Sequence, residues 1–236
     1  YVYERNAGGT NNWGLVKTLS ASDAAGGDFF GYSAGLSGDV AVLGAYRKSS
    51  TQGAAYVYER NAGGTNGWGQ VRKLVASDPV AADFFGRSIS VAGDVIVVGA
   101  SGKDSSQGAA YIFERQAGGT NAWSQVLKLS ASDGAAGDLF GYAAAAAGDR
   151  VAVGAYARTD AFTSQGALYL FHRDSGGAGR WGEVQKLAAS DAADGDSLGY
   201  SMSLAGDLLA AGAYGKNASG GIVYLLQSIY HILPAT

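Results

Sequence analysis

A repeat of about 55 residues runs through the whole chain, and it limits the possible folds more than any other feature. Tryptophan recurs with spacings of 55, 55 and 58 residues, at Trp13, Trp68, Trp123 and Trp181. When residues 1–55 are laid over residues 56–110, 35 of the 55 positions are identical. Self-similarity at a fixed period is typical of arrays in which each copy packs on the next. The 236 residues therefore indicate one array and not two unlike domains.

One copy is predicted to contain four short strands, at Phe30–Leu36, Val40–Ala45, Ala54–Arg60 and Trp68–Leu74. The second is continuously apolar, as expected of a strand covered on both faces. The third is β-branched and aromatic, which favours a strand. The fourth carries Arg72 and Lys73 and alternates poorly, which suits an exposed edge. Four short strands per unit are typical of a propeller blade.

The fold class predicted is all-β: a β-propeller of four-stranded antiparallel blades, with four recognisable repeats and two surplus outer strands. The repeat units are residues 1–29 (partial), 30–83, 84–138, 139–196 and 197–236. The first strand of each blade should lie nearest the ring axis, where glycine and alanine allow close approach. The aromatic residues of the third strand, with the tryptophans, should fill the space between blades.

Counting strands gives 17, or 18 if the tail from Ser228 also forms one. The simplest ring closure would place residues 1–19 as outer strands on the last blade, with residues 221–236 in excess. The alternatives are an incomplete fifth blade or a partial product of a longer ring. An unclosed ring would leave exposed strand edges, which favour self-association.

The repeat unit resembles the FG-GAP repeat, the blade unit of integrin α-subunit propellers and of many bacterial surface and secreted proteins. The residues that carry the resemblance are Phe30 and Gly31, then Gly44 and Ala45, then the run Gly53 to Tyr58. It covers Tyr1 to about Leu226. The resemblance implies a propeller that is extracellular or at the cell surface, here expected to be a bacterial secreted protein.

Two departures from this family matter. The proline that ends the family motif is replaced by Tyr46, Ser101, Tyr156 and Tyr214. Many family members also carry a calcium loop between the first two strands, whereas this chain has only a short turn with one aspartate, such as Asp39. Calcium takes six to eight oxygen ligands. The family's calcium site is therefore not carried over, and the chain resembles the bacterial subtype without it.

Composition argues against several classes of function. The net charge is -3 and there are 17 Lys and Arg residues, so a basic nucleic-acid surface is not expected. No apolar run reaches the length of a membrane-spanning helix. Cysteine is absent, and the two histidines, His172 and His231, have no partner at a catalytic spacing. We therefore expect no enzyme activity.

Two aspartates spaced five residues apart recur in every unit, at Asp23 and Asp28, Asp78 and Asp83, Asp133 and Asp138, and Asp191 and Asp196. The favoured interpretation is architectural: the first caps a turn by accepting backbone N–H bonds, and the second anchors the loop into the next blade. The alternative is a repeated calcium site completed by backbone carbonyls. No cofactor is expected on the favoured interpretation.

The loops after the Gly-Ala strands differ most between copies, and variable loops on a rigid scaffold commonly carry binding. The candidate ligand-binding residues are Tyr46, Arg47, Lys103, Asp104, Tyr156, Arg158, Tyr214 and Lys216. The four tryptophans are expected to pack between blades; the alternative is that they form sugar-stacking platforms.

The function predicted is a non-enzymatic extracellular interaction or adhesion module that binds an extracellular protein or a glycan. Repeated copies favour multivalent contact. One alternative is a propeller lectin with sites between blades or in the loops. The other is a structural subunit that forms homo-oligomers through the exposed edges of an incomplete blade.

Overall fold

The computed structural model describes residues 1–65, 67–115 and 122–227. Seventeen strands lie in this part of the chain and form five antiparallel sheets. Blade 1 comprises β3 (Phe30–Ser37), β4 (Val40–Ala45), β5 (Ala54–Glu59) and β6 (Gly69–Leu74). Blade 2 comprises β7 (Phe85–Ala92), β8 (Val95–Ala100), β9 (Ala109–Arg115) and β10 (Trp123–Leu129). Blade 3 comprises β11 (Ala143–Ala147), β12 (Arg150–Ala155), β13 (Ala167–Arg173) and β14 (Trp181–Leu187).

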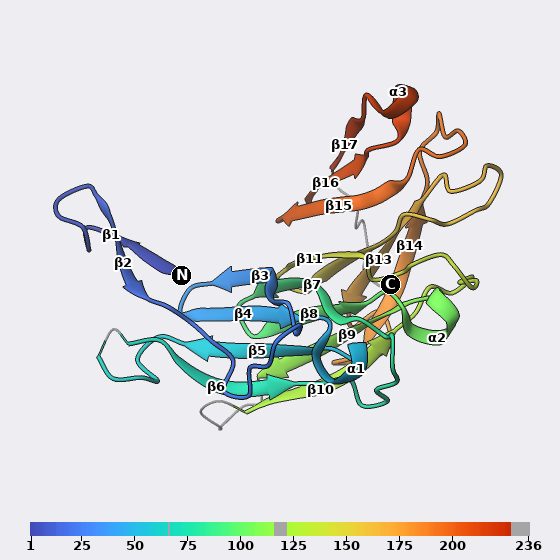
Figure 1. Ribbon diagram of the computed structural model, residues 1–236. Coiled ribbons are helices and arrows are strands. Elements are labelled where there is room, and N and C mark those ends of the chain that lie inside the picture. The colour runs from blue at the N-terminus through green and yellow to red at the C-terminus, as the bar shows by residue number, and fades with distance from the viewer. Residues whose placement is uncertain (66, 116–121, 228–236) are drawn as a thin grey trace.

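The two remaining sheets lie at opposite ends of this array (Figure 1). Blade 4 has three described strands, β15 (Leu198–Ala205), β16 (Leu208–Ala213) and β17 (Ile222–Gln227). The predicted extra strand from Ser228, with His231, lies outside the described residues. The N-terminal half-blade consists of β1 (Val2–Arg5) and β2 (Trp13–Lys17). The all-β class and the four-stranded antiparallel blades are confirmed, and the strands of each blade pair in chain order.

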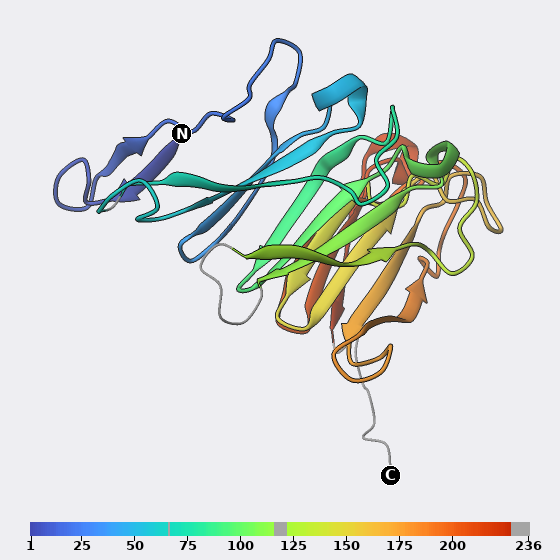
Figure 2. The ribbon, with the colours of Figure 1, turned by 90° about the horizontal axis from the view of Figure 1, so that it is seen from below.

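The predicted ring closure is wrong. The half-blade does not pair with blade 4, because β16 pairs along its whole length with β17 instead. Val2 and Val16 of the half-blade pack on the aromatic residues of blade 1, in the way a preceding blade would. The blades fan out side by side, as Figure 2 shows.

Each blade has a rear face, toward the preceding blade, and a forward face, toward the following one. Val57 and Leu74 on the forward face of blade 1 pack with Tyr111 and Trp123 on the rear face of blade 2. The same arrangement recurs between blades 2 and 3. The hydrophobic core is therefore a series of layers between sheets, which is typical of repeat proteins.

The second strand of one blade lies against the start of the next blade because glycine permits it. A Cβ atom on Gly99 would lie 1.9 Å from the carbonyl oxygen of Gly141 in the next blade. The same contact recurs for Gly44 with Gly86, at 2.1 Å. The hydroxyl of Ser88 also donates a buried hydrogen bond of 2.8 Å to the Gly141 carbonyl. The predicted close approach at the axis is confirmed.

A short turn follows the second strand in blades 1, 2 and 4, at α1 (Lys48–Thr51), α2 (Lys103–Ser106) and α3 (Lys216–Ser219). Three consecutive residues in each have positive φ angles, so these are single irregular turns. The sequence predicts only a loop at each of these places. Each turn begins with a buried lysine, whose side chain fixes the loop in place.

Candidate functional site

Six tyrosines gather at the end of the blades where the first strands begin and the second strands end. They form three pairs, one from each of blades 1, 3 and 4: Tyr32 with Tyr46, Tyr142 with Tyr156, and Tyr200 with Tyr214. The ring centroids within each pair are 4.4 Å apart. The pairs of blades 3 and 4 also touch, since the rings of Tyr142 and Tyr200 lie 5.0 Å apart. We call these six residues, with Arg87, the tyrosine face.

Arg87 takes the place of the first tyrosine in blade 2, and the small Ser101 takes the place of the second. The Arg87 guanidinium lies 4.3 Å from the centre of the Tyr142 ring and 5.6 Å from the centre of the Tyr32 ring. Contacts of this kind between a cation and an aromatic face are attractive. Arg87 thus connects the tyrosine pair of blade 1 with that of blade 3.

Part of the tyrosine face is open to solvent. Tyr32 is 50% exposed, Tyr200 39% and Tyr214 51%, whereas Tyr46 is buried. A hydrogen bond with Tyr142, and next the electrostatic effect of the Tyr142 side chain, raises the pKa of Tyr200 to about 12. Burial raises the pKa of Tyr156. The face is therefore aromatic and uncharged at neutral pH, apart from the guanidinium.

A second repeated cluster lies beside it, built on the paired aspartates. In blade 2, the ammonium of Lys103 lies 3.1 Å from the Asp83 carboxylate and also donates to the backbone carbonyl of Asp78. The hydroxyl of Tyr111 donates to Asp78 at 2.6 Å, and Lys128 pairs with the other Asp78 oxygen at 2.9 Å. Two lysine ammonium groups thus lie against the two aspartates of blade 2.

The contacts of the buried cation recur in all four blades, with one change of residue type, whereas the second cation (Lys73, Lys128 or Lys186) occurs in blades 1 to 3 and has no counterpart among the described residues of blade 4. Lys48 and Lys216 repeat the contacts of Lys103 in blades 1 and 4. In blade 3 the cation is Arg158, whose guanidinium lies 2.8 Å from Asp138 and 3.2 Å from Asp133. An arginine fits here because the inserted loop supplies Asp160 as a further partner at 2.7 Å.

The roles predicted for the two aspartates are corrected by these contacts. The second aspartate caps the turn: Asp83 accepts a backbone N–H bond of 2.7 Å from Val80, and Asp28 does the same from Ala25. The first aspartate instead receives the tyrosine hydroxyl and the lysine ammonium. The capping residue is therefore the second aspartate of each pair, which lies closer in sequence to the blade that follows.

The candidate ligand-binding residues divide into two groups. Lys103, Arg158 and Lys216, named as candidate ligand-binding residues, are buried in the aspartate clusters and support the loops. Asp104 is bound to Lys128 at the surface. Tyr46, Tyr156 and Tyr214 do come together, and Arg47 joins them at the rim, with its guanidinium 4.8 Å from the Phe29 ring centre.

In the calcium alternative, a metal ion would lie between the paired aspartates. In the structure, the ammonium group of a lysine or the guanidinium group of an arginine lies at that place. Its carboxylate and carbonyl contacts are the oxygens that calcium would have used. Among the described residues, no group of three or more His, Asp or Glu side chains could hold a metal ion. We describe these clusters as ion-paired supports for the loops.

Three of the tryptophans lie between blades, as predicted. Trp68, Trp123 and Trp181 are buried, and each indole N–H points to a glutamate of the preceding blade. They are closed off from a sugar in this structure. Trp13 differs, because it is 68% exposed at the N-terminal end of the array.

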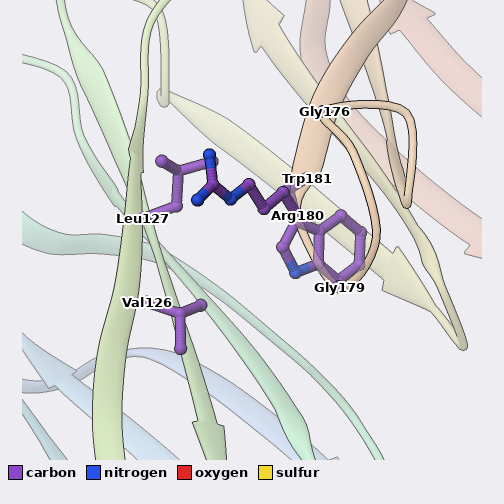
Figure 3. A pocket seen from close by; sticks show the side chains of 6 residues that line it. All are labelled: Val126, Leu127, Gly176, Gly179, Arg180 and Trp181. Atoms are coloured by element: carbon purple, nitrogen blue, oxygen red, sulfur yellow. The ribbon is translucent and has the colours of Figure 1, made fainter.

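A hollow of about 300 Å³ lies at the outer rim between blades 2 and 3. Figure 3 shows it between β10, with Val126 and Leu127, and the hairpin before β14, from which Arg180 extends. No carboxylate or histidine lines this hollow among the described residues. The tyrosine face is the better candidate, since it unites side chains from four blades.

Sequence reasoning missed half of the tyrosine face. Tyr32, Arg87, Tyr142 and Tyr200 follow the Phe-Gly pair, or its Leu-Gly equivalent, by one position in each unit. That regular spacing was a usable signal. The sequence did not reveal that the residue after Phe-Gly or Leu-Gly lies beside the residue after Gly-Ala. Antiparallel pairing of the first two strands of a blade brings these two residues together.

No helix in the described part of the chain is both long and apolar enough to span a membrane. A search of curated proteins found no match. Among solved structures, the chain is similar to Sqt1 of Chaetomium thermophilum, a β-propeller protein, with 13% identity and a TM-score of 0.50. The match covers 80% of this chain and 43% of that one, so the chain spans less than half of the Sqt1 structure. A second structure of the same protein has a TM-score of 0.48.

The family comparison agrees with the blade structure. The model of the FG-GAP repeat matches four times, at residues 13–58, 68–113, 123–171 and 181–226. Each match runs from the last strand of one blade to the third strand of the next. With most of its length matched, the chain belongs to the FG-GAP repeat family.

Proposed function

We propose that this chain is a non-enzymatic extracellular interaction module that binds its ligand on the tyrosine face. Repeats of this family are typical of extracellular proteins, and the family is generally non-enzymatic. The observation that carries the proposal is the convergence of six tyrosines and Arg87 on one partly exposed surface. Tyrosine and arginine are enriched among residues that dominate binding energy at interfaces.

The arrangement supports binding to an extracellular protein. Tyrosine offers a large contact area and a hydroxyl at low cost in side-chain entropy. The rings are already held by their neighbours, so little ordering is needed when a partner docks. Arg87 adds one positive charge at the middle of the face, and no ion pair holds that charge among the described residues. A partner with an acidic group among apolar side chains would match this surface.

A lectin is the second candidate, because exposed tyrosine rings such as Tyr32 and Tyr214 can stack on sugar rings. The two candidates predict different responses to the same substitutions. For stacking, Tyr214→Phe should keep most of the binding, since the ring remains. For a site that depends on hydroxyl hydrogen bonds, the same change should weaken binding.

The test compares the wild-type chain with a Tyr200→Ala, Tyr214→Ala double variant on immobilised extracellular matrix proteins and on a glycan array. Val80→Ala, an exposed change elsewhere, is the control. Saturable binding that the double variant loses at least tenfold, and that Val80→Ala keeps, supports the proposal and identifies the ligand class. Binding that both variants keep would move the site away from the tyrosine face.

A further inference from the structure

Blade 2 departs from the tyrosine pattern at both of its positions. Arg87 stands where the other three blades have the first tyrosine of a pair, and Ser101 stands where they have the second. Ser101 is small and buried. Blade 2 has a blade on each side, because its first strand β7 contacts both β3 and β11. The surroundings of Arg87 are therefore those of an inner blade.

Aromatic rings hold the Arg87 guanidinium in place. It lies 4.3 Å from the ring centre of Tyr142, and 5.6 Å from the ring centres of Tyr32 and Tyr46. A guanidinium has five N–H donors, which is more than these ring contacts can use. Burial would lower the pKa of Arg87, but a hydrogen bond with Tyr142, and next the electrostatic effect of that side chain, outweigh burial and raise it. The side chain therefore keeps its charge.

Other arginines of this chain that stack on a ring also pair with carboxylates. The guanidinium of Arg115 lies 4.8 Å from the Trp123 ring centre, and it pairs with Glu59 and Asp94, each at 3.1 Å. The same arrangement recurs twice, with Arg60 and Arg173. Within the described part of the chain, no aspartate or glutamate lies at ion-pair distance from Arg87. Arg87 thus has the ring contacts of these arginines without their carboxylates.

We propose that Arg87 binds a carboxylate of the ligand, the group that its counterparts receive from this chain itself. This role for Arg87 rests on the proposed function, because it takes the tyrosine face as the binding surface. The group recognised is an aspartate or glutamate side chain of a partner protein, flanked by apolar or aromatic residues. Arginine and a carboxylate can form two parallel hydrogen bonds, which fix orientation as well as adding affinity. Tyr32 in blade 1 and Tyr200 in blade 4, 50% and 39% exposed, offer rings to the flanking residues.

The charge of the face favours a protein carboxylate over an acidic polysaccharide. Of the four equivalent positions that follow the Phe-Gly or Leu-Gly pair, only Arg87 is a cation, and the chain carries a net charge of -3. A polyanion is attracted by a field of many cations, and a protein of negative net charge repels it at long range. A single acidic side chain needs only one guanidinium.

The test selects short random peptides, displayed on phage, on the immobilised full chain of 236 residues. The wild type should enrich peptides with an aspartate or glutamate next to an aromatic or apolar residue. The same selection is made on Arg87→Gln, which removes the charge, and on Arg87→Tyr, which introduces the residue that the other blades have. Arg180→Gln is the matched control, because Arg180 is exposed at the outer rim. Circular dichroism verifies the fold of each variant, and Arg87→Tyr keeps the test valid if Arg87→Gln fails to fold.

The strongest peptide of the wild-type selection is then measured by fluorescence polarisation, with its acidic residue intact and with that residue replaced by its amide. We expect at least a tenfold loss of affinity when either the acid or Arg87 is replaced, and little further loss when both are replaced, since partners in contact are not additive. Arg87→Lys should recover only part of the affinity, because an ammonium lacks the planar fork of donors. Arg180→Gln should bind like the wild type.

A selection that yields no acidic peptides, or no peptides at all, would overturn the proposal. So would an acidic preference that Arg87→Tyr retains, or losses that simply add. If Tyr200→Ala, Tyr214→Ala loses binding while Arg87→Gln keeps it, the tyrosine face remains the binding surface and the carboxylate is rejected. Binding that all of these variants keep rejects the face itself. Binding confined to acidic sugars on the glycan array rejects a protein ligand.

Discussion

The ammonium of Lys103 and the carboxylate of Asp83 lie 3.1 Å apart, and both side chains are almost fully buried. The lysine follows the second strand of blade 2, whereas the aspartate belongs to the segment that enters that blade. The pair thus fastens the loop beside the tyrosine face to the start of the same blade. Removing one partner of a buried pair leaves an uncompensated charge, which is strongly destabilising.

Replacing Lys103 by alanine should lower the free energy of unfolding by about 3 to 5 kcal/mol. The control is Lys73→Ala, which removes an ion pair with the half-exposed Asp23 and should cost less than about 1 kcal/mol. Lys103→Arg should keep most of the stability, because blade 3 already uses Arg158 at this position. Urea denaturation monitored by tryptophan fluorescence measures all three. Equal losses for the two alanine variants would contradict the buried-pair interpretation.

Lowering the pH should destabilise the fold, because it protonates the first aspartate of each pair. The hydrogen bond from Lys73, followed by that from Tyr56, lowers the pKa of Asp23 from 3.8 to about 2. Burial would raise the pKa of Asp78, but hydrogen bonds from Tyr111 and Lys128 outweigh it and lower the value to about 2. A lowered folded-state pKa stabilises the protein above the unfolded value, and that contribution is lost as pH falls through the folded value.

The melting temperature should therefore decline between about pH 4 and pH 2, and scanning calorimetry across this range measures it. In a Lys73→Ala variant the Asp23 part of the decline should become smaller and shift to higher pH. A decline that is identical in this variant would assign the acid sensitivity to other carboxylates.

An alanine at Gly99 should destabilise the protein strongly, because its Cβ would lie 1.9 Å from the Gly141 carbonyl oxygen. The oxygen belongs to the backbone at the start of the next blade, so the blades must move apart; we expect a loss of about 1 to 3 kcal/mol. Gly212 occupies the same position in blade 4, where the nearest atom is the Ser201 hydroxyl, which can rotate. Gly212→Ala should cost less than about 1 kcal/mol.

Thermal melts of these two variants provide the comparison. Similar melting temperatures would mean that the close approach of blades at the axis is not what the glycine serves. A large loss in Gly99→Ala alone confirms that neighbouring blades, and not the strand itself, require it.

Calcium should leave the stability unchanged, because lysine or arginine cations already neutralise the paired aspartates. We expect the same melting temperature, within about 1 °C, in EDTA and in millimolar calcium, since a ligand that does not bind the native state adds no stability. A rise with calcium that Asp28→Asn abolishes would instead support the metal-site alternative. Magnesium at equal ionic strength is the control for screening by salt.

Much of the fold could be predicted from local patterns that repeat. The apolar run Val40–Ala45 and the aromatic run from Ala54 each indicated a strand, and the 55-residue spacing of Trp13 and Trp68 indicated the blade. The structure confirms these elements within a few residues. Repeats are readable in this way because each copy makes the same contacts with its neighbours, so the same residues recur.

Only about half of the tyrosine face could be predicted from the sequence. Tyr46 and Tyr214 were identified from the loop after the second strand, while Tyr32 and Arg87 were overlooked. These residues approach one another only because antiparallel pairing and the fan of blades bring distant positions to one end. The buried position of Lys103 was also missed, since a lysine in a polar loop gives no local sign that its partner lies 20 residues earlier.

The sequence by itself determined the strands, the blade unit and their order, because these depend on local preferences and on a period that the chain repeats. Only the tertiary structure decided which copies of a residue are buried. Trp68 and Trp13 occupy the same place in the repeat, yet one lies between two blades and the other is exposed at the end of the array. Burial depends on what a neighbouring blade covers, and that is a property of the assembled array and not of the repeat.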